Sequence, residues 1–244
     1  MGRLVILTGP SCVGKGPLCA TLERFYPHIY GRLHELILYN DRAPRPGERD
    51  GVDYHFRTRA EIEALRGAEG FAVMDVRGDL QAADLGELRA LLAAGDAFFE
   101  GNPFAASLLL DEARAAGAST LGIFLSPLSR DEVLELRARR LPVDLFVAEV
   151  MRRKLRLRML HMKGAIAPAD LADIERRASS AYPELMLAQR FDFVLVNHDG
   201  EGSGNWDVMG YPVADARKTL HSIAKLLEGS TPDSAEHWAP GDPL

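Results

Sequence analysis

Cysteine, net positive charge and long apolar runs are all scarce in this chain of 244 residues. Its two cysteines, Cys12 and Cys19, have no metal-ligand spacing, so we expect reduced thiols and no protein-held metal centre. No apolar run approaches the roughly 18 residues needed to cross a bilayer. The first residues also lack the charged leader and apolar stretch of a signal peptide. These absences predict a cytoplasmic protein with no membrane partner.

The charge balance excludes a further class of function. The formal net charge is -6 at pH 7, which argues against a general nucleic-acid binder. Hydrophobic residues make up 47% of the chain and charged residues 26%. A chain of this length and composition can bury one sizeable core, with room for a mobile subdomain.

The most informative stretch follows the first apolar run. Leu4 to Leu7 predicts a buried strand, and Gly9, Gly14 and Lys15 then have the spacing of a phosphate-binding loop. Glycines let backbone N–H groups turn toward an anion, a helix N-terminus adds partial positive charge, and Lys15 adds a full charge. The bare pattern is common by chance, and an ordinary strand-to-helix turn is the alternative. Apolar residues at helical intervals predict the helix that such a loop requires: Leu18, Leu22 and Phe25.

One position departs from the usual loop. A Ser or Thr that can meet Mg²⁺ or a phosphate normally follows the lysine, whereas Gly16 and Pro17 follow Lys15 here. Neither has a hydroxyl, and Pro17 has no N–H to donate. We therefore expect weaker contacts to the metal and the nucleotide.

A rigid, charged loop spans residues 40–56, because four Pro and Gly residues there exclude a regular helix. Arg42 and Arg45 are separated only by Ala-Pro, so two planar guanidinium groups can grip one phosphate bidentately. Tyr54 can add a hydroxyl donor. A solvated turn with incidental arginines is the alternative for this stretch alone.

Together the two stretches resemble the guanylate kinase family, a branch of the nucleoside monophosphate kinases. Gly9-Pro-Ser-Cys-Val-Gly-Lys15 is similar to the family's Gly-Pro-Ser-Gly-x-Gly-Lys. The segments 42–48 and 50–56 match its Arg-x-Pro-Arg-x-Gly-Glu and Gly-x-Asp-Tyr-x-Phe almost residue for residue, which is the more specific likeness. The resemblance implies an α/β P-loop kinase fold, in which helices flank a parallel sheet and a helical lid and an acceptor-binding subdomain are attached.

The resemblance also implies roles for individual residues. Arg42, Arg45 and Tyr54 would hold the phosphate of the acceptor GMP, and Asn197, in a Val-x-Asn-Asp-like segment, would lie near the adenine of ATP. The implied catalytic cations are Lys15, Arg42, Arg139 and Arg177, with Mg²⁺ bridging the donor phosphates. The predicted ATP-binding residues are Gly9, Pro10, Ser11, Cys12, Val13, Gly14, Lys15, Gly16 and Asn197.

The likeness weakens after residue 56, at the positions that read guanine. Ala72, Gln81 and Ala83 stand where the family has Glu, Tyr and a hydroxyl residue. Asp75 is the candidate replacement carboxylate, since two guanine donors need an acidic pair of oxygens. Glu100 is the nearest equivalent of the family's Asp-x-Asp pair and completes the predicted acceptor site. Guanine specificity is the least secure part of the resemblance.

Residues 136–177 correspond to the family's lid, and Arg139 and Arg177 match its arginines best. The stretch 146–162 is longer than in the family and predicts a basic helix with an apolar stripe at Met151, Leu155, Met159 and Met162. A packing helix is the favoured interpretation. A partner helix, a homodimer contact and an anionic surface are the alternatives.

The remaining sequence predicts a strand near 35–39 and a helix over 58–66 that begins with a capping box at Thr58 and Glu61. The Gly-rich stretch 200–213 has no counterpart in the family and no assigned role. Residues 1–228 are expected to form one kinase-like domain, with residues 229–244 as a flexible tail. The expected parts of the domain are a core of 1–36, 95–135 and 178–228, an acceptor-binding subdomain of about 37–94 and a lid of about 136–177.

Three functions remain open from the sequence. The first is phosphoryl transfer from ATP to GMP. The second keeps that chemistry with a different phosphorylated acceptor, another nucleotide or a sugar phosphate, as Ala72, Gln81 and Ala83 suggest. The third is a non-catalytic binding domain of the same fold, which Gly16-Pro17 favours and the intact Lys15 opposes.

Overall fold

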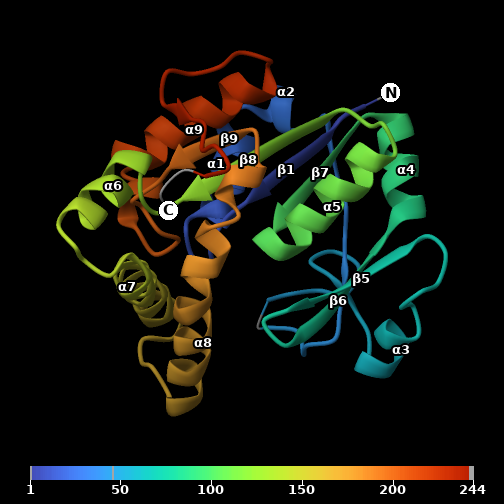
Figure 1. The fold of residues 1–244 in the computed structure, drawn as a ribbon, viewed down its shortest axis with the longest axis horizontal. Helices are drawn as coiled ribbons and strands as arrows, with labels where there is room; N and C mark the ends of the chain where they lie inside the picture. Colours follow the sequence, from blue (N-terminus) through green and yellow to red (C-terminus); the bar gives the residue numbers. More distant parts are fainter. Residues whose placement is uncertain (1, 46, 242–244) are drawn as a thin grey trace. The chain divides into compact units, whose positions relative to one another are not determined.

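The computed structural model describes residues 2–45 and 47–241, whose α/β elements group into two compact units (Figure 1). Unit 1 comprises Met1–Ile6 and Arg32–Leu121, and unit 2 comprises Leu7–Gly31 and Gly122–Leu244. Strand β1, Leu4–Thr8, is fully buried and runs from unit 1 into unit 2. The predicted α/β class and the buried first strand are confirmed, whereas the expected division into core, subdomain and lid stays a prediction.

Unit 1 contains parts of two sheets. In the first, β1 lies beside β7 (Asp96–Gly101), which pairs in parallel with β2 (Leu33–Glu35). The second sheet has the order β4-β3-β6-β5, with bounds Tyr39–Asn40 for β3, His55–Phe56 for β4, Phe71–Val76 for β5 and Asp79–Asp84 for β6. The helices of unit 1 are α3 (Arg59–Glu63), α4 (Leu85–Ala94) and α5 (Pro103–Ala115).

The strand expected near 35–39 is wrong in its extent, because the chain changes sheets there. The backbone N–H of Leu36 still bonds to the carbonyl of Phe98 in β7, but the carbonyl of Leu38 accepts from His55 at the second sheet. Two short strands, β2 and β3, therefore replace the single one. The capping box at Thr58 and Glu61 is confirmed at the start of α3.

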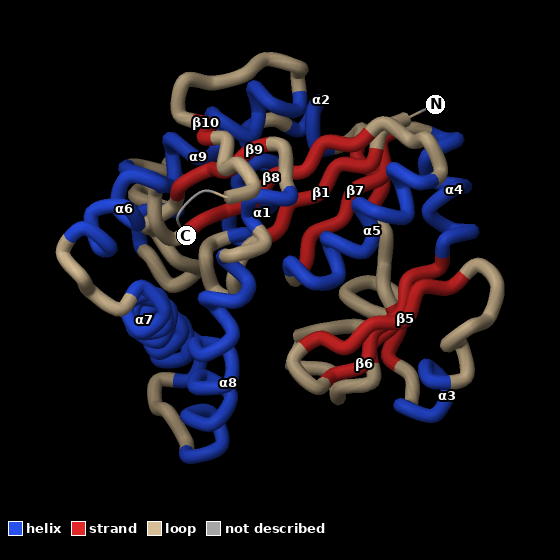
Figure 2. The backbone as a smooth tube through the Cα atoms, in the orientation of Figure 1, coloured by secondary structure: helices blue, strands red, loops and turns tan. Residues whose placement is uncertain are grey.

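The second sheet buries one face against α3. Leu80 and Ala82 of β6 pack with Ile62 of α3, and Figure 2 shows α3 beside the β5–β6 hairpin. Because side chains alternate along a strand, Gln81 and Ala83 project from the opposite face. Ala72 and Met74, which are the register partners of Ala83 and Gln81 on β5, share that opposite face.

Unit 2 has the strand order β10-β9-β8-β1. Strand β8 (Thr120–Ser126) pairs in parallel with β9 (Phe193–Val196), and β10 (Ala235–Glu236) pairs antiparallel with β9. Its α-helices are α1 (Lys15–Phe25), α2 (Pro27–Tyr30), α6 (Arg130–Ala138), α7 (Val143–Lys163), α8 (Pro168–Leu185) and α9 (Ala214–Leu227). Two short 3₁₀ helices, η1 and η2, span Ala188–Arg190 and Gly204–Trp206. Among the described residues, none of these helices combines the length and apolarity of a membrane span.

Helices α7 and α8 pack side by side as a hairpin, as Figure 1 shows. Met151 and Leu155 of the predicted apolar stripe are buried, whereas Met162 is exposed. Arg152 of α7 is bonded to Glu175 of α8 through both Nε and Nη2 at 2.8 Å. The packing-helix interpretation therefore holds for the first half of α7, and a homodimer contact through its second half stays a prediction.

The flexible tail expected at residues 229–244 is wrong for residues 235–238. Ala235–Glu236 forms the edge strand β10, and Trp238 is only 3% exposed. The Glu236 carboxylate accepts hydrogen bonds from the Arg130 backbone N–H and from Trp238 Nε1. Buried indole surface and an edge-strand pairing hold this segment on unit 2, and residues 242–244 lie outside the described part of the chain.

His198 connects three elements of unit 2. It follows β9, its Nδ1 lies 2.5 Å from Asp215 Oδ2 in α9, and its Nε2 lies 3.0 Å from Glu132 Oε2 in α6. Burial alone would lower the pKa of His198, but hydrogen bonds to the two carboxylates and their charges outweigh it and raise the pKa above 6.5. The protonated imidazole thus links α6 and α9.

This arrangement predicts a pH-dependent stability. Because the folded pKa is raised, the contribution of His198 is fully present below pH 6.5 and is lost as pH rises through the folded pKa. The site is half exposed, so we expect a loss of less than about 1 kcal/mol between pH 6 and pH 8. Urea unfolding of wild type and His198→Gln at both pH values measures it, and an equal pH slope in the two proteins would contradict it.

The packing of the C-terminal segment gives a second prediction. Trp238→Ala should lower the free energy of unfolding by about 3 kcal/mol, because it removes a buried indole. Trp238→Phe keeps most of the apolar surface and should lose only about 1 kcal/mol, for the bond to Glu236. Urea denaturation separates the two, and a wild-type midpoint for Trp238→Ala would show that the segment contributes nothing.

Candidate functional site

The loop between β1 and α1 has the backbone of an anion-binding turn. Gly9 and Gly14 have φ angles of 147° and 111°, which glycine tolerates and other residues rarely adopt. A Cβ on Gly9 would lie 2.2 Å from the carbonyl oxygen of Leu125 in β8, so the loop also needs glycine for close approach. Cys12 adopts a φ of 70° despite its side chain. The predicted loop residues 9–14 therefore form one strained, compact turn.

Lys15 is the first residue of α1 and is only 7% exposed. Its Nζ donates to the carbonyl oxygens of Gly9 at 3.1 Å and Pro10 at 3.4 Å, so the ammonium lies over the loop. The first turn of α1 contains no acidic residue, and Gly14 makes no side-chain cap. The helix N-terminus and the Lys15 charge therefore act at the same loop.

The structure brings Arg177 of α8 to this loop and places Arg139 elsewhere. Arg177 is buried, its Nη2 pairs with Asp173 Oδ2 at 2.8 Å and its Nη1 lies 3.4 Å from Ser11 Oγ. Arg139 follows α6, is 69% exposed and donates to Glu135 Oε1 at 2.5 Å. Of the two predicted lid arginines, only Arg177 has a described contact with the loop.

Asn197, after β9, differs from its expected position. Its side chain is fully buried, and Nδ2 donates to the carbonyl oxygens of Val13 at 2.7 Å and Asp199 at 2.5 Å. Both amide hydrogens are thereby used, which leaves none for a nucleobase. Asn197 shapes the phosphate-binding loop from behind.

Lys154 and Arg158 of α7 are site residues that the sequence reasoning missed. Lys154 Nζ donates to the Asn197 carbonyl at 3.1 Å, and burial lowers its pKa to about 8. Its own carbonyl lies 3.4 Å from the Sγ of Cys12, and burial raises the pKa of that thiol to about 12. The available signal was their spacing of four residues beside Met151 and Leu155, which places them on the packed face of the helix.

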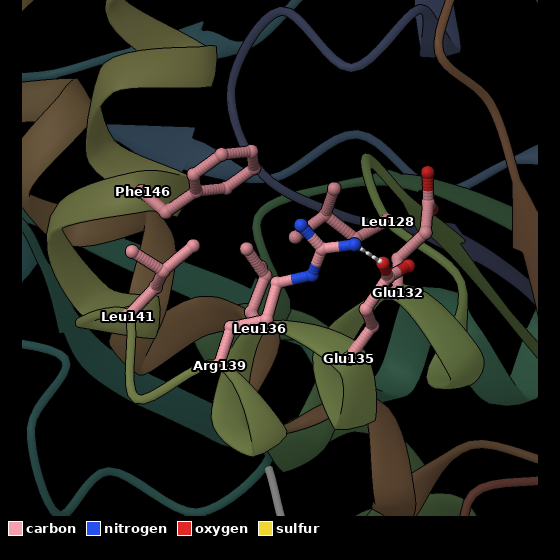
Figure 3. Close-up of a pocket in the computed structure, with 7 residues that line it drawn as sticks. All are labelled: Leu128, Glu132, Glu135, Leu136, Arg139, Leu141 and Phe146. Carbon is pink, nitrogen blue, oxygen red and sulfur yellow. Dashed lines mark hydrogen bonds and ion pairs between the residues drawn. The ribbon is translucent and has the colours of Figure 1, made fainter.

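A cavity of about 270 Å³ opens beside α6 and the start of α7 (Figure 3). Figure 3 shows the Arg139 guanidinium directed toward Glu135, with the ring of Phe146 also bordering the space. Glu132, which lines the cavity, also contacts His198 next to Asn197. The lining residues are Leu128, Glu132, Glu135, Leu136, Arg139, Leu141 and Phe146. Apolar walls with a few charged groups suit a flat, polar-edged ring.

The chain offers no ligand set for a resident metal. Among the described residues, no three His, Cys, Asp or Glu side chains gather in a metal-binding cluster. Gly16, at the usual hydroxyl position, is exposed and faces open space. These residues do not fit a protein-held Mg²⁺ at the loop.

Unit 1 holds the predicted acceptor arginines. The guanidinium of Arg42 donates from Nη1 and Nη2 to the two oxygens of Glu48, both at 2.7 Å. It also lies 5.1 Å from the ring centre of Tyr54 and 5.6 Å from that of Phe56. Burial alone would lower the pKa of Arg42, but the bonds and charge of Glu48 more than offset it and raise the pKa. Arg42 is therefore a fixed cation on an aromatic base.

Arg45 and Glu100 lie around the same group. Glu48 accepts from the Arg45 backbone N–H at 2.7 Å and lies 3.7 Å from its guanidinium. Burial and the charge of Glu100 raise the pKa of Tyr54, so its hydroxyl stays protonated as a donor. The structure thus gathers Arg42, Arg45, Tyr54 and Glu100, as predicted, while Pro46 of this loop lies outside the described residues.

Asp75 does not join this group. It is exposed, and its Oδ1 accepts from the Gly78 N–H at 2.9 Å in the turn between β5 and β6. Strand alternation places Asp75 on the opposite face from Ala72, Met74 and Gln81. The expectation that Asp75 replaces the missing guanine carboxylate is therefore wrong.

Comparison with known proteins agrees with this geometry. The family model for guanylate kinase matches residues 1–73. The guanylate kinase of Synechococcus sp. (strain JA-3-3Ab) is 32% identical over 202 residues, covering 82% of this chain and 77% of that protein. The guanylate kinase of Mycolicibacterium paratuberculosis is 34% identical over 190 residues, covering 76% and 79%.

A solved structure shares the fold. The crystal structure of guanylate kinase from Anaplasma phagocytophilum aligns with a TM-score of 0.55 over 93% of this chain and 85% of that chain, at 19% identity. That likeness supports the P-loop kinase fold alone. With the sequence relatives and the site geometry, it leads to one conclusion: the chain belongs to the guanylate kinase family.

Proposed function

We propose that this protein transfers the γ-phosphoryl group of ATP to GMP, with unit 2 holding the donor and unit 1 holding the acceptor. The observation that carries the proposal is Lys15, a buried ammonium at a helix N-terminus, folded over the carbonyls of a glycine loop. The names of the relatives support the same reaction. Phosphoryl transfer needs little covalent help from a protein, so positioned cations are the main requirement.

On the donor side, backbone N–H groups of residues 9–14 and the N-terminus of α1 bind the phosphates. Lys15 moves from the loop carbonyls to the phosphate oxygens, and Arg177 neutralises charge that develops on the transferred group. Asp173 holds the Arg177 guanidinium in place. The cavity beside Glu132 and Phe146 takes the adenine ring.

Mg²⁺ is part of the substrate in this proposal. The loop lacks the hydroxyl that would hold the ion, so it enters bound to the phosphates of ATP. The protein residues orient that complex and supply the remaining positive charge. No general base is required, because the acceptor phosphate is already an anion.

On the acceptor side, the Arg42 and Arg45 guanidinium groups and the Tyr54 hydroxyl bind the phosphate of GMP. Glu48 keeps the Arg42 fork oriented before the substrate arrives, which reduces the entropy lost on binding. A planar fork matches two phosphate oxygens at once, so Lys cannot replace it without loss.

A second candidate function has a specific observation in its favour. The face of the second sheet opposite α3 carries Ala72, Gln81 and Ala83, so these three positions supply neither a carboxylate nor a hydroxyl for guanine. Gln81 instead pairs in register with Asn40, whose buried Nδ2 has no hydrogen-bond partner among the described residues. Two neutral amides favour an acceptor other than guanine, such as another nucleotide or a sugar phosphate.

A coupled ADP-release assay decides between the two. Purified protein with MgATP is tested against GMP, dGMP, AMP, CMP, UMP and ribose phosphates. Turnover confined to GMP and dGMP supports the first candidate, and turnover with another acceptor supports the second. Silence with the whole panel would overturn both.

Lys15→Ala should lower kcat by at least about a hundredfold, since one cation at the transferring phosphate is lost. The unfolding midpoint serves as the control for folding. Turnover within tenfold of wild type, in protein that melts like wild type, would show that Lys15 is not catalytic.

Arg42→Lys should raise the KM for the acceptor about tenfold and leave the KM for ATP unchanged, because the bidentate fork is lost. Arg57→Lys is the matched control, since Arg57 forms an exposed ion pair with Asp50 in the same unit. Initial-rate kinetics with each substrate varied in turn measures the effect. Equal behaviour of the two variants would rule out the assigned role of Arg42.

A further inference from the structure

The Gly-rich stretch after β9 is an ordered element rather than a loose loop. We call residues 199–206 the Trp206 loop. The Asp199 carboxylate accepts from Ser203 Oγ and Asn205 Nδ2 through Oδ1, and from the Ala216 N–H through Oδ2. Trp206 is only 8% exposed, and its Nε1 donates to the Gly200 carbonyl at 3.0 Å. These bonds fix the loop from within and tie it to the start of α9.

The Trp206 loop and the preceding Asn197 contact three consecutive residues of the phosphate-binding loop. The Glu201 N–H lies 3.3 Å from the Cys12 carbonyl, and Asn197 donates to the Val13 carbonyl. A Cβ on Gly14 would lie 2.8 Å from Trp206 Cζ2 and 2.8 Å from the Asp199 carbonyl. The indole therefore packs directly behind Gly14, one residue before Lys15 and α1.

The opposite side of the Trp206 loop lies against α7. Glu201 pairs with Arg158 at 2.8 Å, with both side chains mostly buried. A Cβ on Gly200 would lie 3.0 Å from the Lys154 side chain, and one on Gly202 would lie 2.9 Å from the Arg158 backbone nitrogen. The Trp206 loop is thus a wedge that contacts both the phosphate-binding loop and α7.

This wedge has a physical purpose at a strained turn. The φ angles of Cys12 and Gly14 are both positive, and a hydroxyl residue after Lys15 is lacking. A turn in unfavourable conformations persists only when its surroundings hold it. Solid packing behind Gly14 supplies that support without any contact to the nucleotide.

We propose that the Trp206 loop holds the phosphate-binding loop in its nucleotide-binding conformation, with Trp206 as the positioning residue behind Gly14. The inference rests on the proposed function for the identity of the nucleotide, ATP. It assigns a role in donor affinity to a segment outside the nucleotide contacts, and it predicts that the indole senses occupation of the loop.

Direct binding of a non-hydrolysable ATP analogue, measured by calorimetry, tests the proposal. Trp206→Ala should weaken this binding about tenfold and raise the KM for ATP by a similar factor, with the KM for the acceptor unchanged. Trp206→Phe keeps a ring behind Gly14 and should recover most of the affinity. Trp238→Phe is the control, because Trp238 is equally buried and has no described contact with the phosphate-binding loop.

Fluorescence supplies a readout that a purely structural role would not change. The chain has two tryptophans, so Trp238→Phe leaves Trp206 as the sole emitter and Trp206→Phe leaves Trp238. The analogue should shift the emission of the first protein and leave that of the second unchanged. Because Trp206 is intact in the first, this measurement decides the question even where Trp206→Ala does not fold.

Two results would overturn the proposal: unchanged analogue affinity in folded Trp206→Ala, or an unchanged Trp206 emission on saturation with the analogue. Wild-type protein that binds the analogue but phosphorylates no acceptor would contradict the proposed function alone, since binding and emission still decide the role of Trp206. Wild-type protein that does not bind the analogue would overturn both.

Discussion

The phosphate-binding loop can present its N–H groups to an anion only while its backbone stays at unfavourable φ angles. Gly9, Cys12 and Gly14 all have positive φ, and Gly9 and Gly14 leave no room for a side chain. Such a turn costs free energy of folding, about 1 kcal/mol or more at the non-glycine position. Much of unit 2 meets that cost: the buried β1 and β8, the Asn197 amide, the Trp206 indole and the first turn of α1 all confine these residues.

Paired charges impose a second order on the molecule. Arg42 with Glu48, and Arg177 with Asp173, are largely buried pairs, so each guanidinium is oriented before a phosphate arrives. Arg139 with Glu135 is an exposed pair, which solvent screens and which contributes little to stability. The contrast separates cations that are fixed for phosphate binding from one at the rim of a cavity. It also explains why a count of arginines in the lid says little about which of them act.

Strand alternation decides which side chains share the acceptor face of unit 1. Ile62, Leu80 and Ala82 bury the face toward α3, so Gln81 and Ala83 must project from the other side. The same alternation removes Asp75 from that face, and the turn at Gly78 uses its carboxylate. The identity of the acceptor therefore depends on a surface that the chain has rebuilt with amides and alanines.

The sequence by itself determined the local features: the strand, glycine loop and helix of residues 4–25, the capping box at Thr58, and the paired arginines of the loop after Asn40. Each depends on spacing over a few residues, where backbone geometry and residue type suffice. Only the tertiary structure decided that Asn197 turns its amide to Val13, that Lys154 and Arg158 reach the loop from α7, and that Trp206 packs behind Gly14. These contacts join residues from about 40 to almost 200 positions apart. Burial and strand pairing bring such residues together, and no local pattern records which partner a side chain will meet.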